Sequence, residues 1–272
     1  MRSLVQQWAL AHLPSPVIHW LKKRHYLRLL KDQGPNEEPD FALIAKLVKP
    51  GDCVIDVGAN YGVFMKFLSE LVGDTGIVYC IEPVPGTFEI ISSNATNLKL
   101  NNVHLMNCAF SDHKADAVME IPRLPGGGEN YYQARIIDDR SDPTLRQVKI
   151  KTVTLDSQFA SKGRAIDFIK CDVEGHELRC VSGAIQVLRT CRPAWCVEVS
   201  GDPDQSGSDS WRLFRLFETE GYESFWFDGR VLKKRRPADK SINYFFLQPS
   251  HLPSLGCLLS AGELPEGKGR ET

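Results

Sequence analysis

The chain has 272 residues, and its 33 basic and 34 acidic residues give a formal net charge of −1. Its apolar fraction of 42% and charged fraction of 25% are typical of one principal soluble domain with modest extensions. The near-neutral charge argues against a protein drawn as a whole to nucleic acid or anionic membranes, and no run of about 18 apolar residues predicts a transmembrane helix.

Residues 1–50 are predicted to form an N-terminal helical extension. Within it, residues 19–31 hold five Lys or Arg and no acid. This stretch is either a helix with a solvated basic face or an amphipathic helix that covers a substrate cleft or makes peripheral contact with a membrane. The first twenty residues lack the unbroken apolar core of a signal peptide.

Eight scattered cysteines form no CxxC pair, and no histidine lies near them at zinc spacing. Several of these cysteines fall in apolar, strand-like runs. We therefore expect buried free thiols, no structural metal, and a cytoplasmic location.

Strands and helices alternate from Asp52 onward. Strands are predicted at 53–57, 77–82 and 103–110, and again at 166–171 and 194–199, with helices of one-sided apolar pattern between them. Continuously apolar strands of this kind are typical of a parallel sheet covered by helices on both faces. The pattern predicts an α/β fold of the Rossmann-like type.

The alternation is interrupted at 112–165, which we predict to be an insertion of loops and short β structure. Near the end of the domain, residues 222–228 and 242–248 are predicted to form an antiparallel pair of strands, which brings the count to seven. The predicted domain spans 51–248. Residues 249–272, rich in Pro, Gly, Ser and charge, are predicted to be a flexible C-terminal tail.

The turn after the first strand predicts a cofactor site. A helix that starts directly after a parallel strand presents free N–H groups, and glycines allow a ligand to approach the backbone. Gly58 and Gly62 meet this requirement, with Ala59 and Asn60 between them. Asp56 would oppose a pyrophosphate but favour the ammonium of an amino-acid ligand.

The ends of the second and third strands supply the rest of this predicted site. Glu82, followed by Pro83, is placed to accept hydrogen bonds from a ribose diol, and Cys108 and Ala109 would flank an adenine. Together with Asp56, these residues favour S-adenosyl-L-methionine. The structural alternative is that Asp56 caps a helix and that Glu82 is an exposed loop acid.

Several segments of the chain resemble one methyltransferase family. VIDVGANYG, IEPVPGTFEIISSN, NCAFSD, TLDS and DFIKCDVEGHELRCVSGA, followed by PAWCVEVS, are similar to the FkbM family of class I methyltransferases over residues 38–248. The resemblance implies a seven-stranded, mostly parallel sheet with an antiparallel last strand and bound S-adenosylmethionine. It also implies O-methylation of a hydroxyl on a sugar, glycolipid or other natural product.

A second group of polar residues follows the fourth and fifth long strands of the expected parallel sheet, where ligands of open α/β sheets bind. It comprises Lys170, Asp172, Glu174, His176 and Glu198. Methyl transfer to a hydroxyl requires alignment and removal of a proton. Our hypothesis makes Asp172 the base, with His176 as the alternative base.

In the same hypothesis Glu174 and Glu198 hold the acceptor, and Lys170 steers charge within the cluster. Each of these residues also has a structural interpretation, because acids stabilise helix N-termini and Lys170 could be a buried ion-pair partner.

Three alternatives stay open at the level of sequence. The carboxylates could bind magnesium, although metal-free catalysis is favoured. A nicotinamide oxidoreductase is disfavoured by Asp56 and by the absence of GxGxxG. The third alternative is a catalytically silent module that binds adenosylmethionine and acts as an adaptor through its N-terminal helix. No nucleic-acid partner is expected.

Overall fold

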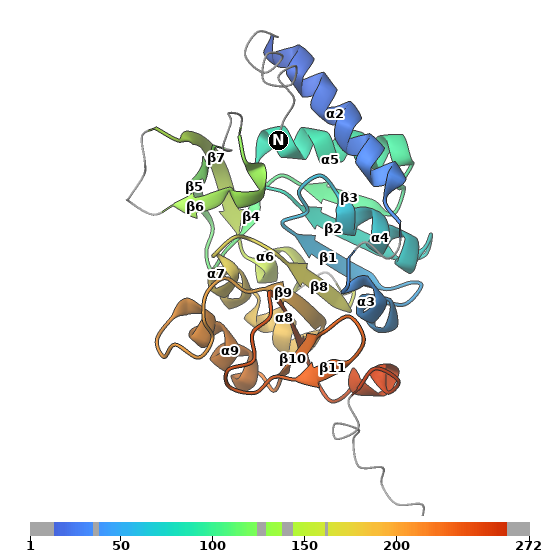
Figure 1. Cartoon of the computed structure of the whole chain (residues 1–272), viewed down its shortest axis with the longest axis vertical. Coiled ribbons are helices and arrows are strands. Elements are labelled where there is room, and N and C mark those ends of the chain that lie inside the picture. Colours follow the sequence, from blue (N-terminus) through green and yellow to red (C-terminus); the bar gives the residue numbers. More distant parts are fainter. Residues whose placement is uncertain (1–13, 35–37, 124–128, 138–143, 161–162, 260–272) are drawn as a thin grey trace, which may run out of the picture.

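A computed structural model describes residues 14–34, 38–123, 129–137, 144–160 and 163–259 of the chain, which are organised around two β-sheets (Figure 1). The main sheet has eight strands in the order β11-β10-β12-β9-β8-β1-β2-β3. These strands are β1 Cys53–Val57, β2 Ile77–Ile81, β3 Val103–Met106, β8 Phe168–Cys171, β9 Ala194–Glu198, β10 Glu223–Phe227, β11 Leu232–Lys234 and β12 Asn243–Leu247.

The strand directions confirm the predicted α/β fold with a reversed last strand. β3, β2, β1, β8 and β9 run parallel, whereas β12 is antiparallel to both β9 and β10. The count differs from the predicted seven because β11 adds an eighth strand at the edge, antiparallel to β10. This short strand carries two lysines, a composition that does not predict a strand but suits an exposed edge.

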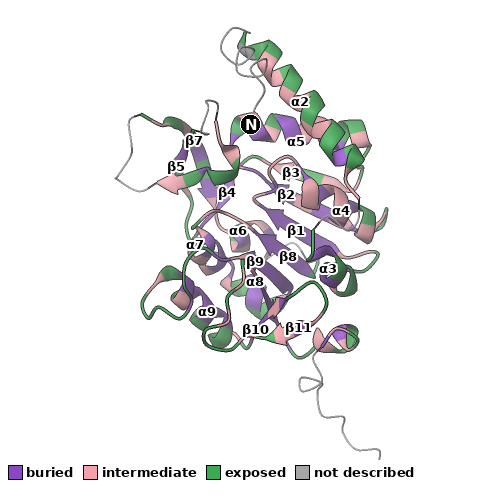
Figure 2. Ribbon diagram, viewed as in Figure 1, coloured by how far each residue is buried: buried purple, intermediate pink, exposed green. Residues whose placement is uncertain are grey.

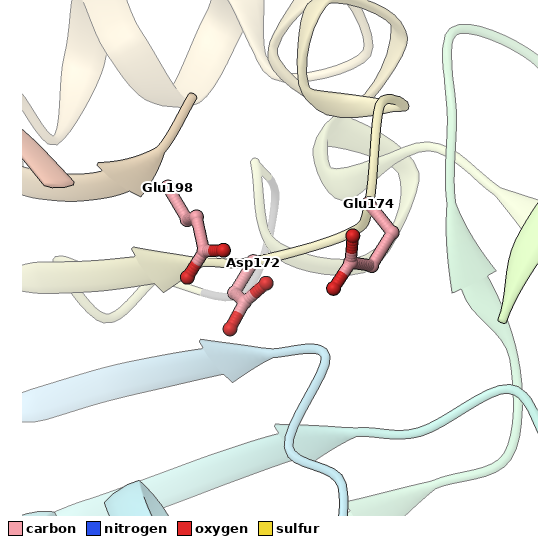
Figure 3. A group of neighbouring side chains, drawn as sticks. All are labelled: Asp172, Glu174 and Glu198. Carbon is pink, nitrogen blue, oxygen red and sulfur yellow. The ribbon is translucent and has the colours of Figure 1, made fainter. Parts of the chain in front are cut away.

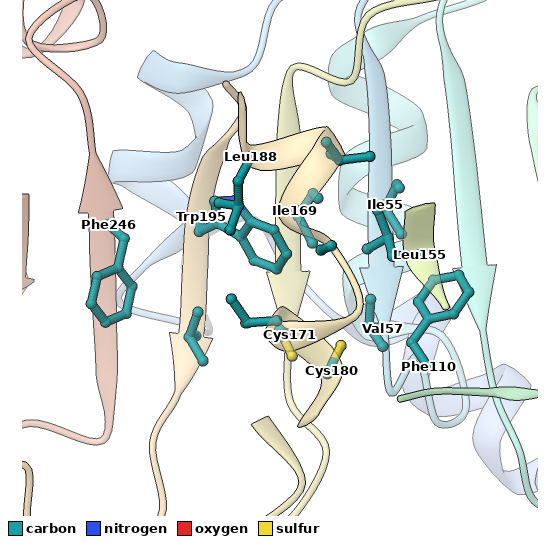
Figure 4. Packing of buried hydrophobic residues seen from close by; sticks show 14 of the residues in the cluster. Ile55, Val57, Phe110, Leu155, Ile169, Cys171, Cys180, Leu188, Trp195 and Phe246 are labelled. Atoms are coloured by element: carbon teal, nitrogen blue, oxygen red, sulfur yellow. The ribbon is translucent and has the colours of Figure 1, made fainter. Parts of the chain in front are cut away.

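Helices cover both faces of the main sheet, and alternate residues of its strands face opposite cores. Ile55, Ile169 and Trp195 pack in the core beneath α6 to α9 (Figure 4), whereas Val54 and Phe168 pack in the core beneath α3 to α5. The helices are α2 Ser15–Asp32, α3 Phe41–Leu47, α4 Val63–Val72, α5 Pro85–Leu98, α6 Leu155–Phe159, α7 Glu177–Ser182, α8 Ile185–Thr190 and α9 Asp209–Thr219, with 3₁₀ turns η1 Tyr131–Gln133 and η2 Leu252–Leu255. None of the helices in the described ranges is long and apolar enough to cross a membrane.

The inserted residues, together with β4 just before them, form a second, four-stranded sheet in the order β4-β7-β5-β6. Its strands are β4 Ala109–Phe110, β5 Ala115–Ile121, β6 Arg135–Ile137 and β7 Arg146–Val153. The predicted single strand at 103–110 is therefore wrong, because β3 ends at Met106 and β4 pairs with β7 in the other sheet. This sheet stands beside the carboxyl ends of the main strands (Figure 1).

The predicted flexible tail is also wrong for residues 249–259. The turn η2 follows β12, and Leu255 and Leu259 are buried against the core that contains α3 and α4. Burying these apolar side chains offsets the cost of ordering a Pro- and Ser-rich segment. Residues 260–272 lie outside the described part of the chain. Figure 2 shows buried residues concentrated in the central strands.

A glycine fixes the distance between the turns that follow β1 and β8. Gly58 has a φ of +83°, and a Cβ added there would lie 1.8 Å from the carbonyl oxygen of Asp172. The backbone hydrogen bond from Asp172 N–H to Val57 O adds to this contact. The two turns therefore form one unit at the carboxyl edge of the sheet.

Substitution of this glycine tests the contact. Gly58→Ala and Gly175→Ala both place a side chain at positive φ, which costs about 1–2 kcal/mol. Only Gly58 meets backbone atoms, since nothing lies within 4 Å of a Cβ at Gly175, whose φ is +85°. We expect Gly58→Ala to lower the free energy of unfolding in urea by about 1–3 kcal/mol more than Gly175→Ala does. Equal losses would contradict the proposed contact.

Candidate functional site

A cavity of about 310 Å³ opens at the carboxyl ends of β1, β2, β8 and β9. Ligands of open α/β sheets bind at this edge. Most of the sequence-predicted site residues line the cavity, although they come from five separate segments of the chain. They are Asp56, Gly58, Ala59, Asn60, Glu82, Pro83, Ala109, Lys170, Asp172, Glu174, His176 and Glu198.

Glu82 joins the turn after β1 to the turn after β2. Asn60 N–H donates to its Oε2 at 3.0 Å, and Val84 N–H donates to its Oε1 at 2.9 Å. Burial raises the pKa of Glu82 to about 7, against the opposing effect of these two hydrogen bonds. Each carboxylate oxygen keeps a further lone pair that a ligand hydroxyl can use. This geometry differs from the exposed loop acid of the structural alternative.

Asp56 lies at the floor of the cavity with an incomplete set of partners. Its side chain is buried, and its Oδ2 has no hydrogen-bond partner among the described residues. Burial raises the pKa of Asp56 to about 7, while the nearby Lys170 lowers it. A buried carboxylate oxygen without a partner is costly, so this site fits a ligand that brings a cationic donor.

Lys170 is the buried cation of the site. It neighbours Asp56 in the register of β8 and β1, and its Nζ lies 3.5 Å from Asp172 Oδ2 and 5.1 Å from the ring centroid of Phe64. Burial lowers the pKa of Lys170, but attraction to surrounding acids, Asp172 first, raises it above its usual value. The ammonium therefore stays charged and partly compensates the acidic side chains around it.

Three carboxylates, those of Asp172, Glu174 and Glu198, gather after the ends of β8 and β9 (Figure 3). One ligand oxygen from each of Asp172, Glu174 and Glu198 lies within 4.8 Å of the others. Burial and then repulsion by Asp172 raise the pKa of Glu198 to about 7, and the same two causes raise the pKa of Glu174. With this pKa, the half-buried Glu198 carboxyl can exchange a proton near neutral pH.

Glu174 occupies a strained backbone conformation at this point. Its φ is +49°, in the left-handed region that residues other than Gly, Asn and Asp rarely adopt. Strain of this kind persists only where the surrounding structure holds it, and it is concentrated at functional sites. The neighbouring Glu177 accepts a 2.7 Å hydrogen bond from Gly175 N–H and so has a structural role at the start of α7.

His176 lies between the cavity and the inserted sheet. Its Nε2 is 3.0 Å from the Oγ of Ser111, a buried residue that follows β4. Which of the two ring nitrogens accepts a proton depends on the tautomer, so His176 stays the alternative base.

Two predicted cofactor residues do not line the cavity. Gly62 has a φ of +104° at the start of α4, where a Cβ would lie 2.6 Å from Met65 Cε. It therefore serves the packing of the helix. Cys108 is buried in the core beneath α6 to α9, and burial raises its thiol pKa to about 11.

An aromatic rim was not predicted from the sequence. Tyr61, Tyr131 and Tyr132 line the mouth of the cavity. Tyr26 of α2 stacks on Tyr61 with ring centroids 4.6 Å apart, and Lys22 Nζ lies 4.7 Å from the ring centroid of Tyr131. The pair Tyr131-Tyr132 was the only local signal that could have located this rim.

Comparison with known proteins identifies the family. The family model described as "Methyltransferase FkbM domain" matches residues 56–224, which contain both polar groups of the cavity. A curated relative, the 31-O-demethyl-FK506 methyltransferase FkbM of Streptomyces tacrolimicus, is 29% identical over 159 residues, which cover 50% of this chain and 60% of the relative.

Solved structures give further likenesses at low identity. A methyltransferase FkbM from Methylobacillus flagellatus is 13% identical with a TM-score of 0.45, over 83% of this chain and 59% of that one. A SAM-dependent methyltransferase from Aquifex aeolicus is 15% identical with a TM-score of 0.41, over 81% and 96%. The chain thus covers less than two thirds of the length of the Streptomyces relative and of the Methylobacillus structure. On the domain match, this chain belongs to the FkbM family of S-adenosylmethionine-dependent methyltransferases.

Proposed function

We propose that this protein is an S-adenosylmethionine-dependent O-methyltransferase that acts on a hydroxyl of a sugar, glycolipid or other natural product. One observation carries the proposal. The acidic cluster of Asp172, Glu174 and Glu198 opens on the same cavity as Asp56 and Glu82. A cofactor site and groups able to bind and deprotonate a hydroxyl thus face each other.

The chain's own residues fit the cofactor. Asp56 would hold its ammonium, because Oδ2 is buried without a partner. Glu82 would hold the ribose hydroxyls, and Gly58 and Ala59 line the cavity at the turn after β1. Pro83 and Ala109 line the cavity beside Glu82, where they would border the adenine. When bound, S-adenosylmethionine supplies a methyl group activated by a sulfonium.

Asp172 is the proposed base. It is partly accessible and is anchored by the ammonium of Lys170 at 3.5 Å, so its carboxylate can point at an acceptor without losing its buried counter-charge. Glu198 and Glu174 would hold the acceptor hydroxyl and its neighbours. General-base catalysis of this type contributes about 10²- to 10⁴-fold to a rate.

The named relative supports oxygen as the acceptor atom. The Streptomyces tacrolimicus protein is called a 31-O-demethyl-FK506 methyltransferase. The tyrosine rim of Tyr61, Tyr131 and Tyr132 further supports an acceptor with a flat or apolar face, because aromatic side chains bury large areas against such surfaces.

Cofactor binding tests the roles of Asp56 and Glu82. Asp56→Asn and Glu82→Gln should each weaken S-adenosylmethionine about 10- to 100-fold in calorimetry, because each removes a charge-assisted hydrogen bond. The exposed Glu70→Gln is the control. Since the carboxyls of Asp56 and Glu82 have pKa values raised to about 7, wild-type affinity should increase as the pH rises through that value and they ionise. Affinity equal to that of the control would contradict these roles.

Turnover tests the base. Asp172→Asn should lower kcat for labelled-methyl transfer about 10²- to 10⁴-fold while cofactor affinity stays within a few-fold of wild type. The control is Asp74→Asn, in an exposed turn. Near wild-type turnover would remove Asp172 from this role. Cofactor binding without transfer by the wild type to any hydroxylated candidate would favour the silent adaptor.

Chelation tests the magnesium alternative. Lys170 already supplies a buried positive charge beneath the carboxylates, so we expect kcat to be unchanged after dialysis against a chelator. Loss of activity that magnesium restores would show instead that the acidic cluster holds a cation.

A further inference from the structure

We propose that helix α2 binds a membrane surface that carries anionic lipid headgroups. The outer face of this helix is defined by Val17, Trp20, Leu21, Arg24 and Arg28. Apart from the adjacent Trp20 and Leu21, neighbouring positions are three or four residues apart, so all five form one stripe along the helix. All five residues are exposed.

The first observation is a concentration of exposed apolar side chains. In the described part of the chain, six large apolar side chains are exposed, and four of them belong to α2. On the outer face, Trp20 is 53% exposed and Val17 and Leu21 are 40% and 43% exposed, whereas Leu29 lies to one side of it. Scattered apolar residues are normal on a protein surface, but a group on one helix marks an interaction site.

The second observation is the charge of the same face. Arg24 and Arg28 lie on it, and the exposed Lys31 continues the stripe. Arg24 Cζ lies 4.9 Å from the ring centroid of Trp20, so the guanidinium and the indole lie next to each other on this face. Asp32, which lies 3.5 Å from Arg28, is the only acid in the helix. The whole chain has a net charge of −1, so this basic character is local.

The third observation is that the inner face of α2 is already bound to the domain. His19 and Lys23 contact Glu89 of α5 at 2.8 and 3.5 Å. The Lys66 ammonium donates to the carbonyl oxygen of Leu30 at 2.9 Å, and Leu30 is fully buried. The outer face is therefore what remains exposed after the helix has packed, as Figure 2 shows along its length.

A lipid surface fits this combination of side chains. Tryptophan places an apolar ring and a polar N–H at the headgroup boundary, and arginine keeps its charge in water while its stem lies on apolar surface. Apolar side chains that enter the headgroup boundary and basic side chains that attract anionic lipids together favour binding of a helix in the plane of a membrane. Each Lys or Arg near such a surface adds its own contribution to the free energy of membrane binding.

Because α2 also borders the cavity, membrane binding by this helix would affect which acceptor can reach the site. The inner face of the same helix forms part of the cavity rim through Tyr26, which stacks on Tyr61, and Lys22, which lies over Tyr131. A membrane on the outer face would therefore lie near the cavity mouth, which favours a lipid-anchored hydroxyl as acceptor. This consequence rests on the proposed function, whereas membrane binding does not require it.

Vesicle co-sedimentation tests the proposal on the full chain without any activity measurement. We expect the protein to sediment with vesicles of phosphatidylcholine and phosphatidylglycerol in equal parts, and to stay in solution with phosphatidylcholine alone. The double variant Arg24→Gln/Arg28→Gln should bind the mixed vesicles about 30-fold more weakly. Trp20→Ser should also weaken binding, and added salt should weaken it in the wild type.

Matched controls keep the test specific. Arg212→Gln/Arg215→Gln removes two exposed arginines from α9, and Ile242→Ser removes the most exposed large apolar side chain that the described residues offer outside α2. Both should bind like the wild type. Equal binding to both kinds of vesicle, or equal losses in the α2 and control variants, would overturn the proposal. So would a self-association in solution that Trp20→Ser abolishes, because the face would then be a protein contact.

Discussion

The buried ammonium of Lys170 is the interaction on which the rest of the site depends. It lies in the middle of a parallel sheet, beside Asp56 in the next strand and 3.5 Å from Asp172 at the cavity floor. Removing Asp172 would leave the fully buried ammonium with less compensation, and removing Lys170 would leave Asp56 without a nearby cation. Lys170 therefore lies beside both Asp56, which we propose binds the cofactor, and Asp172, the proposed base. The half-buried Glu198 lies nearby, and attraction to the same ammonium stabilises its carboxylate, which lowers its pKa against the larger effect of burial.

The central part of the fold follows from local sequence patterns. Strands β1 and β8 consist of apolar residues interrupted only by Asp56 and Lys170, and these two interruptions lie side by side. Strand β11 was missed because three residues with two lysines carry no strand pattern, and only pairing with β10 orders them. The split at 103–110 depends on pairing with β7, some forty residues further along the chain, and no local pattern reports such a partner.

The candidate site is likewise predictable from the sequence only where its residues follow local patterns. The turn at Gly58, the carboxylate of Glu82 and the acids after β8 are predictable, because each follows a strand whose end is visible in the sequence. The rim formed by Tyr26 on Tyr61 is not, since it depends on how α2 packs. Cys108 was assigned to the cofactor because its strand was expected to continue to residue 110. Its true position follows from the change of sheet after Met106.

One titration tests the central role of Lys170 most directly. Calorimetry with S-adenosylmethionine across a range of pH would compare the wild type with Lys170→Met, with far-UV circular dichroism confirming that the variant is folded. Without the ammonium, the pKa of Asp56 should rise further, since Lys170 lowers it in the native protein. The midpoint of the pH dependence of binding should move to a higher pH in Lys170→Met than in the wild type, because the pKa of Asp56 rises above about 7. An unchanged midpoint and affinity in a folded variant would contradict it.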